Sequence, residues 1–158
     1  MQWAANNTVF HWFRALIMIL FATTIIVLLS RYKLVIVHGN SMHPTLTDGQ
    51  LLIIHTNESK IEKGDIIVFE KEHIIYIKRV VATSGDRVEQ NCSSDYLAVN
   101  GNCVIGCENE LIEGNTISTL IPSASFFVIG DNYCDSIDSR SSKVGLVRQD
   151  EVVGVVRN

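Results

Sequence analysis

The sequence predicts a mainly β fold, in which an antiparallel β domain follows a single N-terminal transmembrane helix. The first observation is a charge-free apolar run over residues 15–30. The second is the pattern after it, where short stretches rich in β-branched residues alternate with turn sequences. Such a succession is typical of an all-β domain. No soluble amphipathic helix, internal repeat or low-complexity linker interrupts it.

The N-terminal run has the composition of a membrane anchor. Ala15–Ser30 spans 16 residues, slightly fewer than the roughly 20 that cross a bilayer as a helix. Extension back to Val9 gives 22 residues and includes Arg14, whose long side chain can reach the interface. We interpret residues 1–33 as an N-terminal segment with a transmembrane anchor and residues 34–158 as a β-rich catalytic domain. Aromatic residues fit the two membrane interfaces: Trp12, Phe13 and Tyr32.

Two alternatives to an anchor are a cleaved secretory signal and a buried core helix. The first 13 residues contain no Lys or Arg, and the run ends in Leu28-Leu29-Ser30-Arg31 instead of a small-x-small site. Both features disfavour a cleaved signal. A core helix of a soluble protein stays open as an alternative.

Seven apolar stretches are predicted to be strands, and Gly-containing turns separate them. Asn100-Gly101, between two apolar stretches, predicts a tight hairpin. The polar segment Glu108–Thr119 is interpreted as an excursion from the β domain. The predicted strands are Leu34–Val37, Leu51–His55, Asp65–Phe69, Ile74–Ala82, Tyr96–Val99, Phe126–Ile129 and Val152–Val156.

Charge and cysteine content restrict the partners and the compartment. The net charge is −4 and no basic run is present, so nucleic acid is not an expected partner. The four cysteines contain no C-x-x-C pair, which disfavours a zinc site. An even number of cysteines in an anchored domain fits an oxidising compartment. Three disulfide connectivities are possible; we favour a local bridge among Cys92, Cys103 and Cys107, with four unpaired thiols, including Cys134, as the alternative.

The charges around the anchor and the cysteine content favour opposite orientations in the membrane. Arg14 lies on one side, and Arg31 and Lys33 lie on the other. The positive-inside rule alone therefore favours a cytoplasmic C-terminal side, whereas the cysteines favour an extracytoplasmic one.

Ser41 and Lys78 have the surroundings expected of a serine–lysine hydrolase. Ser41 lies just past the end of a predicted strand, and Lys78, 37 residues later, sits in an apolar β-prone run. A serine hydroxyl needs a base within hydrogen-bond reach, and a lysine can serve only if burial keeps it neutral. Histidines near the serine, His38 and His43, are competing candidates for the base.

A third polar patch covers residues 126–140. A predicted strand ends in the turn Gly130-Asp131-Asn132, and hydroxyl, carboxylate and guanidinium groups follow. Arg140 can form a charge-assisted pair with Asp138 or Asp131, and Ser136 can exchange a hydrogen bond with a lysine amine. The alternative is an Asx-rich surface turn.

Four motifs, taken in order, resemble the bacterial type I signal peptidase (leader peptidase) family of the Ser–Lys dyad type. The resemblance covers residues 34–156. It implies a membrane-anchored, mainly β serine endopeptidase that removes signal peptides from exported preproteins and needs no cofactor. The motifs are S-M-x-P-T-L at 41–46, G-D-I-I-V-F at 64–69, Y-I-K-R-V-V-A-T-S-G-D-R-V at 76–88 and G-D-N-x-x-x-S-x-D-S-R at 130–140.

The resemblance implies a role for each matching residue. Ser41 would be the nucleophile and Lys78 the general base, with Ser136 orienting the lysine amine. Asp138 and Arg140 would support the site through a salt bridge. Met42 would line the pocket wall beside Gly39 and Asn40 of the oxyanion and substrate strand.

The chain departs from the family pattern at two positions. Gly39 stands where some members have a serine that completes the oxyanion hole, so backbone N–H groups, including that of Ser41, are expected to stabilise the oxyanion. Tyr133 stands where Arg commonly follows the Gly-Asp-Asn turn. We expect this second departure to alter the packing of that loop and not the dyad.

The substrate is expected to lie extended beside the strand before Ser41 and the strand before Lys78. Shallow apolar pockets there suit small residues at the first and third positions before the cut. Their candidate lining residues are Val35, Val37, Ile75 and Ile77.

The resemblance also implies surroundings and partners. It places the protein in the cytoplasmic membrane as a single-pass protein with an extracytoplasmic catalytic domain. The implied partners are signal peptides, membrane lipid and the secretion translocon. A dedicated pilin- or conjugation-type maturation protease and a non-enzymatic membrane-anchored β domain are the two alternatives.

Overall fold

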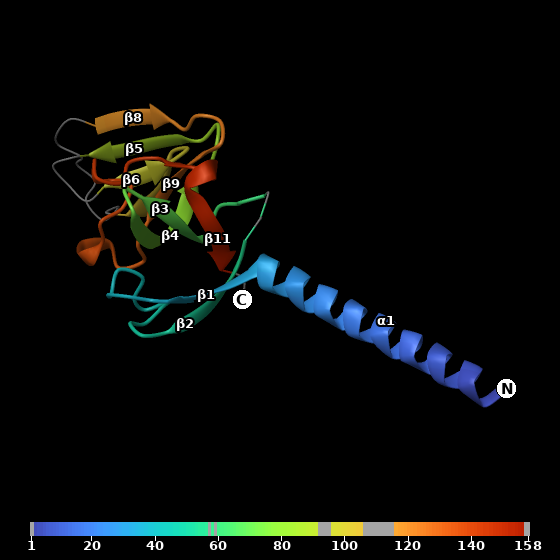
Figure 1. Ribbon diagram of the computed structural model, residues 1–158. Coiled ribbons are helices and arrows are strands. Elements are labelled where there is room, and N and C mark those ends of the chain that lie inside the picture. The colour runs from blue at the N-terminus through green and yellow to red at the C-terminus, as the bar shows by residue number, and fades with distance from the viewer. Residues whose placement is uncertain (1, 57, 59, 92–95, 106–115, 157–158) are drawn as a thin grey trace.

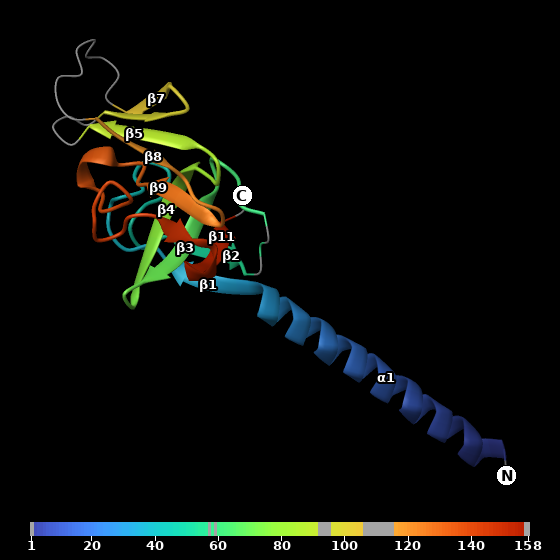
Figure 2. The same cartoon turned by 90° about the horizontal axis from the view of Figure 1, so that it is seen from above.

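The structure, a computed structural model, describes residues 2–56, 58, 60–91, 96–105 and 116–156. Helix α1 (Gln2–Arg31) projects from a β domain built of two antiparallel sheets (Figures 1 and 2). The fold is therefore mainly β with one apolar N-terminal helix, as the sequence predicts.

Helix α1 has a long apolar segment that is not covered by protein. Its segment Phe10–Arg31 is long and apolar enough to cross a membrane, and none of it is buried. Three hydroxyl groups donate to carbonyl oxygens of the preceding turn, including Ser30 Oγ to Val27 O at 2.8 Å. Donation inside the helix satisfies these polar groups without water, which suits an apolar surrounding.

The larger sheet has the strand order β1-β2-β11-β3-β4-β9-β10, and the smaller sheet has the order β7-β6-β5-β8. The larger sheet contains β1 (Tyr32–Ile36), β2 (Leu51–His55), β3 (Ile66–Lys71), β4 (Ile74–Ala82), β9 (Ser125–Ile129), β10 (Val147–Arg148) and β11 (Val152–Val156). The smaller sheet contains β5 (Arg87–Asn91), β6 (Leu97–Val99), β7 (Asn102–Ile105) and β8 (Thr116–Leu120). Two 3₁₀ helices, η1 (Tyr133–Asp135) and η2 (Gln149–Glu151), lie in the connections.

All seven predicted strands are present. β2, β4 and β11 have the predicted bounds, and the ends of β1, β3, β6 and β9 differ from the predicted ones by at most two residues. The predicted hairpin is also confirmed. Asn100 and Gly101 have φ angles of 52° and 76°, the positive values that a two-residue hairpin turn requires.

The prediction that Glu108–Thr119 is an excursion from the β domain is wrong at the C-terminal end of that segment. Residues 108–115 of the segment lie outside the described residues. Strand β8 begins at Thr116 and pairs with β5 along its whole length. Strands β5 and β10 are further additions to the predicted set. β5 buries Val88 among polar neighbours, β10 is only two residues long, and β8 exposes Ile117 and Leu120. The local apolar pattern is therefore too weak to indicate these strands, and pairing with strands distant in sequence decides their conformation.

Three apolar clusters fill the domain, and strand β4 links two of them. Val80 belongs to the cluster of the larger sheet and Ala82 to the cluster beneath the smaller sheet. A third cluster joins the segments on either side of Ser41 to the larger sheet; its buried members are Val37, Met42, Leu46, Leu52 and Ile66.

Asp86 connects three turns at the junction of the two sheets. Its carboxylate accepts hydrogen bonds from Thr83 N at 2.8 Å, Asn100 Nδ2 at 2.6 Å and Lys63 Nζ at 3.1 Å. Partial burial alone would raise the pKa of Asp86, but these donors outweigh it and lower the pKa to about 2. The carboxylate form therefore stabilises the fold above the unfolded-state pKa, and this stability is lost as the pH falls through the folded-state pKa.

We expect Asp86→Asn to lower the free energy of unfolding by about 2 kcal/mol at pH 7 and by much less at pH 2.5. Urea unfolding in detergent micelles at the two pH values measures the difference. Asp150→Asn, which removes a carboxylate from a fully exposed ion pair, is the matched control and should have little effect at either pH. An equal loss for Asp86→Asn at pH 7 and pH 2.5 would contradict the electrostatic account.

Candidate active site

Ser41 sits in a tight loop that buried side chains anchor. Met42 and Leu46 are 1% and 4% exposed, and the Leu46 N–H donates to the Met42 carbonyl at 2.9 Å. Each buried side chain contributes roughly 2 kcal/mol. The apolar positions of S-M-x-P-T-L therefore hold the loop, whereas Ser41 stays partly exposed. The predicted wall residue Met42 borders the cleft beside Ser41.

A carboxylate that the sequence analysis did not identify shapes the approach to Ser41. Gly39 has a φ of 83°, and its N–H donates to Asp48 Oδ1 at 2.8 Å. Glycine adopts this left-handed conformation at no steric cost, which favours Gly39 at this position. Because its N–H is already engaged, Gly39 supplies the turn and not a free donor.

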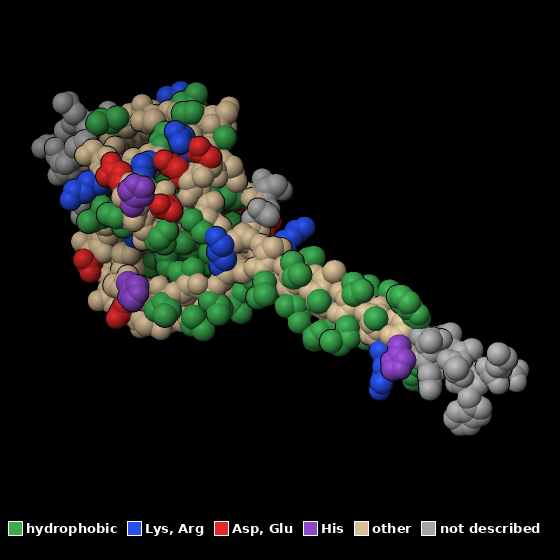
Figure 3. All heavy atoms as spheres, viewed as in Figure 1, with side chains coloured by type: hydrophobic (Ala, Val, Ile, Leu, Met, Phe, Trp, Pro, Cys, Tyr) green, Lys and Arg blue, Asp and Glu red, His purple; other side chains and the backbone are tan. Residues whose placement is uncertain are grey.

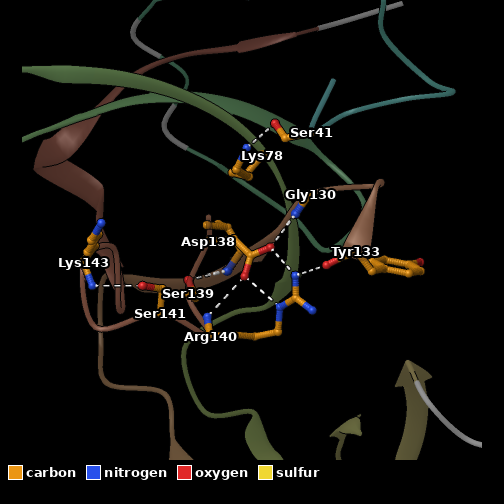
Figure 4. Close-up of polar contacts among 10 residues, drawn as sticks. Ser41, Lys78, Gly130, Tyr133, Asp138, Ser139, Arg140, Ser141 and Lys143 are labelled. Carbon is orange, nitrogen blue, oxygen red and sulfur yellow. Dashed lines mark hydrogen bonds and ion pairs between the residues drawn. The ribbon is translucent and has the colours of Figure 1, made fainter. Parts of the chain in front are cut away.

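Lys78 lies on the core-facing side of strand β4, opposite the fully buried Ile67 of β3. Its side chain is 4% exposed, and its Nζ lies 2.5 Å from Ser41 Oγ, within a hydrogen bond (Figure 4). The two residues are therefore brought together as the sequence analysis expects, with the amine enclosed by protein.

Burial lowers the pKa of Lys78 from its ordinary value because the charged ammonium loses its hydration. The carboxylates of Asp138 and Asp131 favour the charged form but do not cancel this effect. A neutral amine can accept the proton of a hydroxyl group, so the pKa of Lys78 is shifted in the direction that base catalysis by lysine requires.

Asp138 is the ion-pair partner of Arg140. The sequence left Asp138 and Asp131 open as alternative partners of this arginine. Arg140 Nε and Nη2 each lie 2.9 Å from a carboxylate oxygen of Asp138, and Gly130 N–H donates to the same group at 3.0 Å (Figure 4). Burial opposes the charge, but these hydrogen bonds lower the pKa of Asp138. Arg140 also donates to the Tyr133 carbonyl at 2.7 Å, so the ion pair shapes the whole loop despite the unusual Tyr133.

Asn132 connects this loop to the Ser41 loop. Its N–H donates to the Ser41 carbonyl at 3.0 Å, and its side-chain amide donates to the Asn40 carbonyl at 3.1 Å. Segments that are about 90 residues apart in sequence are thus fixed side by side. Asn40 therefore contributes its carbonyl group to this connection.

Ser136 lies on the same cleft as Ser41 and Lys78. Its Oγ is buried and makes no hydrogen bond of good geometry among the described residues, although the hydroxyl helps to lower the pKa of Asp138. The close approach of Ser136 to Gly130 leaves no room for a side chain at that glycine. The predicted contact of Ser136 with the lysine amine stays a prediction.

A second forked ion pair flanks Lys78 and was not identified from the sequence. Arg79 Nε and Nη2 lie 2.8 Å and 2.6 Å from the two carboxylate oxygens of Asp131. Arg79 also donates to the Gly64 carbonyl at 2.7 Å. Asp131 is thus the partner of Arg79 and not of Arg140. The sequence shows a second basic residue, Arg79, directly after Lys78. It contains no pattern that indicates which carboxylate Arg79 pairs with, because that carboxylate lies 52 residues away.

The two loops and strands β1 and β4 enclose a cleft of ≈ 680 Å³ that contains Ser41 and Lys78. The four predicted pocket residues, Val35, Val37, Ile75 and Ile77, all line it. His38 also borders the cleft, but the hydrogen bond of Ser41 Oγ is to Lys78. Within the described ranges, no cluster of His, Cys, Asp or Glu could hold a metal ion.

The two cysteines that the structure describes differ in state. Cys103 is disulfide-bonded, which agrees with the favoured bridge among Cys92, Cys103 and Cys107. Cys92 and Cys107 themselves lie outside the described residues. Cys134 is a free, exposed thiol on η1 at the edge of the cleft.

Comparison with known proteins gives consistent matches. Residues 9–158 match the signal peptidase family, peptidase S26. The chain is 30% identical to signal peptidase I T of Bacillus subtilis (strain 168), covering 94% of this chain and 83% of the relative. It is 34% identical to signal peptidase IB of Staphylococcus aureus (strain Mu50 / ATCC 700699), covering 76% and 73%.

A solved structure gives a further match. The crystal structure of a signal peptidase I from Enterococcus faecalis V583 matches with 27% identity and a TM-score of 0.46. The match covers 63% of this chain and 98% of the other chain.

Proposed function

This chain belongs to the signal peptidase family, peptidase S26, and on that premise we propose that it is a membrane-bound serine endopeptidase with Ser41 as nucleophile and Lys78 as general base. The substrates are the signal peptides of exported preproteins. The observation that carries the proposal is the 2.5 Å contact between Ser41 Oγ and a buried Lys78 Nζ at the floor of an open cleft.

The proposed reaction is acyl transfer. Neutral Lys78 accepts the Ser41 hydroxyl proton as Oγ attacks the scissile carbonyl, and the backbone N–H of Ser41 stabilises the oxyanion. The carbon–nitrogen bond breaks, and the leaving amine takes the proton from Lys78. Lys78 then removes a proton from water, which attacks the acyl-enzyme; the bond to Ser41 Oγ breaks, the second product leaves, and Lys78 returns the proton to Ser41 Oγ. In this proposal Ser136, whose buried Oγ lines the same cleft, orients the lysine amine.

Strand edges on both sides of the cleft support extended substrate binding. Among the described strands, β1 pairs only with β2, and β4 pairs with β9 only from Arg79 onward. In the part of the chain that the structure describes, the second edge of Ile74–Lys78 is therefore free. An extended peptide can pair with these edges, while the apolar side chains of β1 and β4 contact its alternate residues. Such shallow contacts suit small side chains at the first and third positions before the cut.

Two features support membrane attachment with the β domain outside the cytoplasm. The outward face of the β1–β2 ribbon continues the apolar surface of α1 (Figure 3). A disulfide at Cys103 indicates an oxidising compartment. We propose a single-pass protein of the cytoplasmic membrane, in contact with lipid and the secretion translocon. The apolar side chains on that face are Leu34, Ile36, Leu51 and Ile53, each more than half exposed.

The test uses detergent-solubilised full-length protein, a preprotein with an A-x-A site and mass spectrometry of the products. Wild type is expected to cut directly after A-x-A, whereas Ser41→Ala is expected to leave the preprotein intact. Ser142→Ala removes an exposed loop hydroxyl and is the matched control, with cleavage expected at the wild-type rate. Cleavage by Ser41→Ala at the wild-type rate would refute the proposed nucleophile.

A further inference from the structure

Two carboxylates act on Lys78, and each is held by an arginine fork. Asp131 receives the fork of Arg79, and Asp138 receives the fork of Arg140. Both carboxylates favour the charged form of Lys78. The arginines carry the opposite charge at hydrogen-bond distance from those carboxylates, so they offset this influence.

Arg79 is the sequence neighbour of Lys78, whereas Arg140 lies in another loop. It follows Lys78 in strand β4, and strand geometry directs successive side chains to opposite faces. Its guanidinium then turns to Asp131 and is held in place by the Gly64 carbonyl at 2.7 Å. The side chains of Arg79 and Asp131 are 30% and 13% exposed. This pair is therefore only partly screened by water.

We propose that Arg79 is a positioning residue that keeps Lys78 neutral by compensating the charge of Asp131. The inference rests on the proposed function, in which Lys78 acts as the base. Without Arg79, an uncompensated carboxylate would stabilise the ammonium form, and fewer molecules would hold the base in its active state at neutral pH. The other titratable side chains that line the cleft with Lys78 are His38, Tyr76, Cys134 and Asp135, and His43 and Asp48 lie in the adjoining Ser41 loop.

The test measures kcat/KM against pH for the full-length protein in detergent, with an internally quenched peptide that contains an A-x-A site. In wild type, activity rises with pH as Lys78 loses its proton. Arg79→Gln is expected to shift this rising, acidic limb of the pH profile to higher pH by about one unit. Activity near pH 7 then falls about tenfold, while the plateau at high pH is retained.

The carboxylate variant gives the opposite sign. Asp131→Asn removes the negative charge and leaves Arg79, so the limb is expected to move to lower pH. The double variant Arg79→Gln/Asp131→Asn removes both charges and should return the limb close to the wild-type position. Arg148→Gln, in an exposed ion pair with Asp150, is the matched control and should leave the limb in place.

The outcomes separate this inference from the proposed function. Two results would show a purely structural role for Arg79 and overturn the inference. One is a loss of activity at every pH without a shift of the acidic limb, and the other is a double variant whose limb stays away from the wild-type position. If Arg79→Gln does not fold, an unshifted limb in Asp131→Asn overturns it equally. If wild type does not cleave and acylating inhibitors leave Ser41 unmodified, the proposed function fails first, and this inference fails with it.

Discussion

Replacing Lys78 with methionine is expected to lower kcat/KM by at least ~10³-fold at every pH, because the amine in contact with Ser41 Oγ is removed. The same change should keep or raise the melting temperature. Lys78 is 4% exposed and its pKa is lowered by burial, so protonation of this amine opposes folding at neutral pH. A methionine of similar length removes that opposition and fills the same space.

The combination of lost activity and retained stability distinguishes a catalytic lysine from a structural one. Peptide cleavage and thermal unfolding of the same preparation measure the two effects. Lys143→Met changes an exposed lysine outside the cleft and should alter neither. Lys78→Met with a rate near wild type would exclude Lys78 as the base and return attention to His38 and His43.

The parts of the fold that were predictable are those whose residues follow a local pattern. Strands β2 and β4 alternate or concentrate β-branched side chains, and their bounds agree with the prediction. Strand β8 reads T-I-S-T-L and is held by pairing with β5, more than 20 residues earlier. Such a strand has no local signature, because the energy that stabilises it comes from a distant partner.

The candidate site shows the same division. Ser41, Lys78 and the Asp138–Arg140 pair lie within short motifs, so their positions were readable from the sequence. The fork of Arg79 on Asp131 joins residues 52 positions apart, and its geometry depends on the packing of β4 against β9. The Asp48 contact to Gly39 spans only nine residues, but its existence depends on a left-handed turn that the sequence alone did not reveal.

Gly130→Ala is expected to be the most damaging substitution outside the proposed dyad. A Cβ atom at Gly130 would lie less than 3.0 Å from Ser136 Oγ and from the Ser41 carbonyl oxygen, a distance that real Cβ atoms essentially never show. The Ser41 carbonyl cannot move freely, because Asn132 N–H holds it at 3.0 Å. The clash must therefore displace the nucleophile loop or Ser136.

Displacement of a reacting group by about 1 Å can reduce the rate ~100-fold, so we expect a loss of at least that size in kcat for Gly130→Ala. Gly154→Ala is the matched control. Its Cβ would meet the His55 carbonyl oxygen at 2.7 Å between β11 and β2, away from the cleft. That variant should lose stability, by about 1–3 kcal/mol, and keep its kcat. A kcat for Gly130→Ala within threefold of wild type would contradict the tight contact, whereas equal losses in both variants would trace the effect to destabilisation. A loss confined to Gly130→Ala would mean that the contact between the Gly130 turn and the Ser41 loop holds the nucleophile at reacting distance from Lys78.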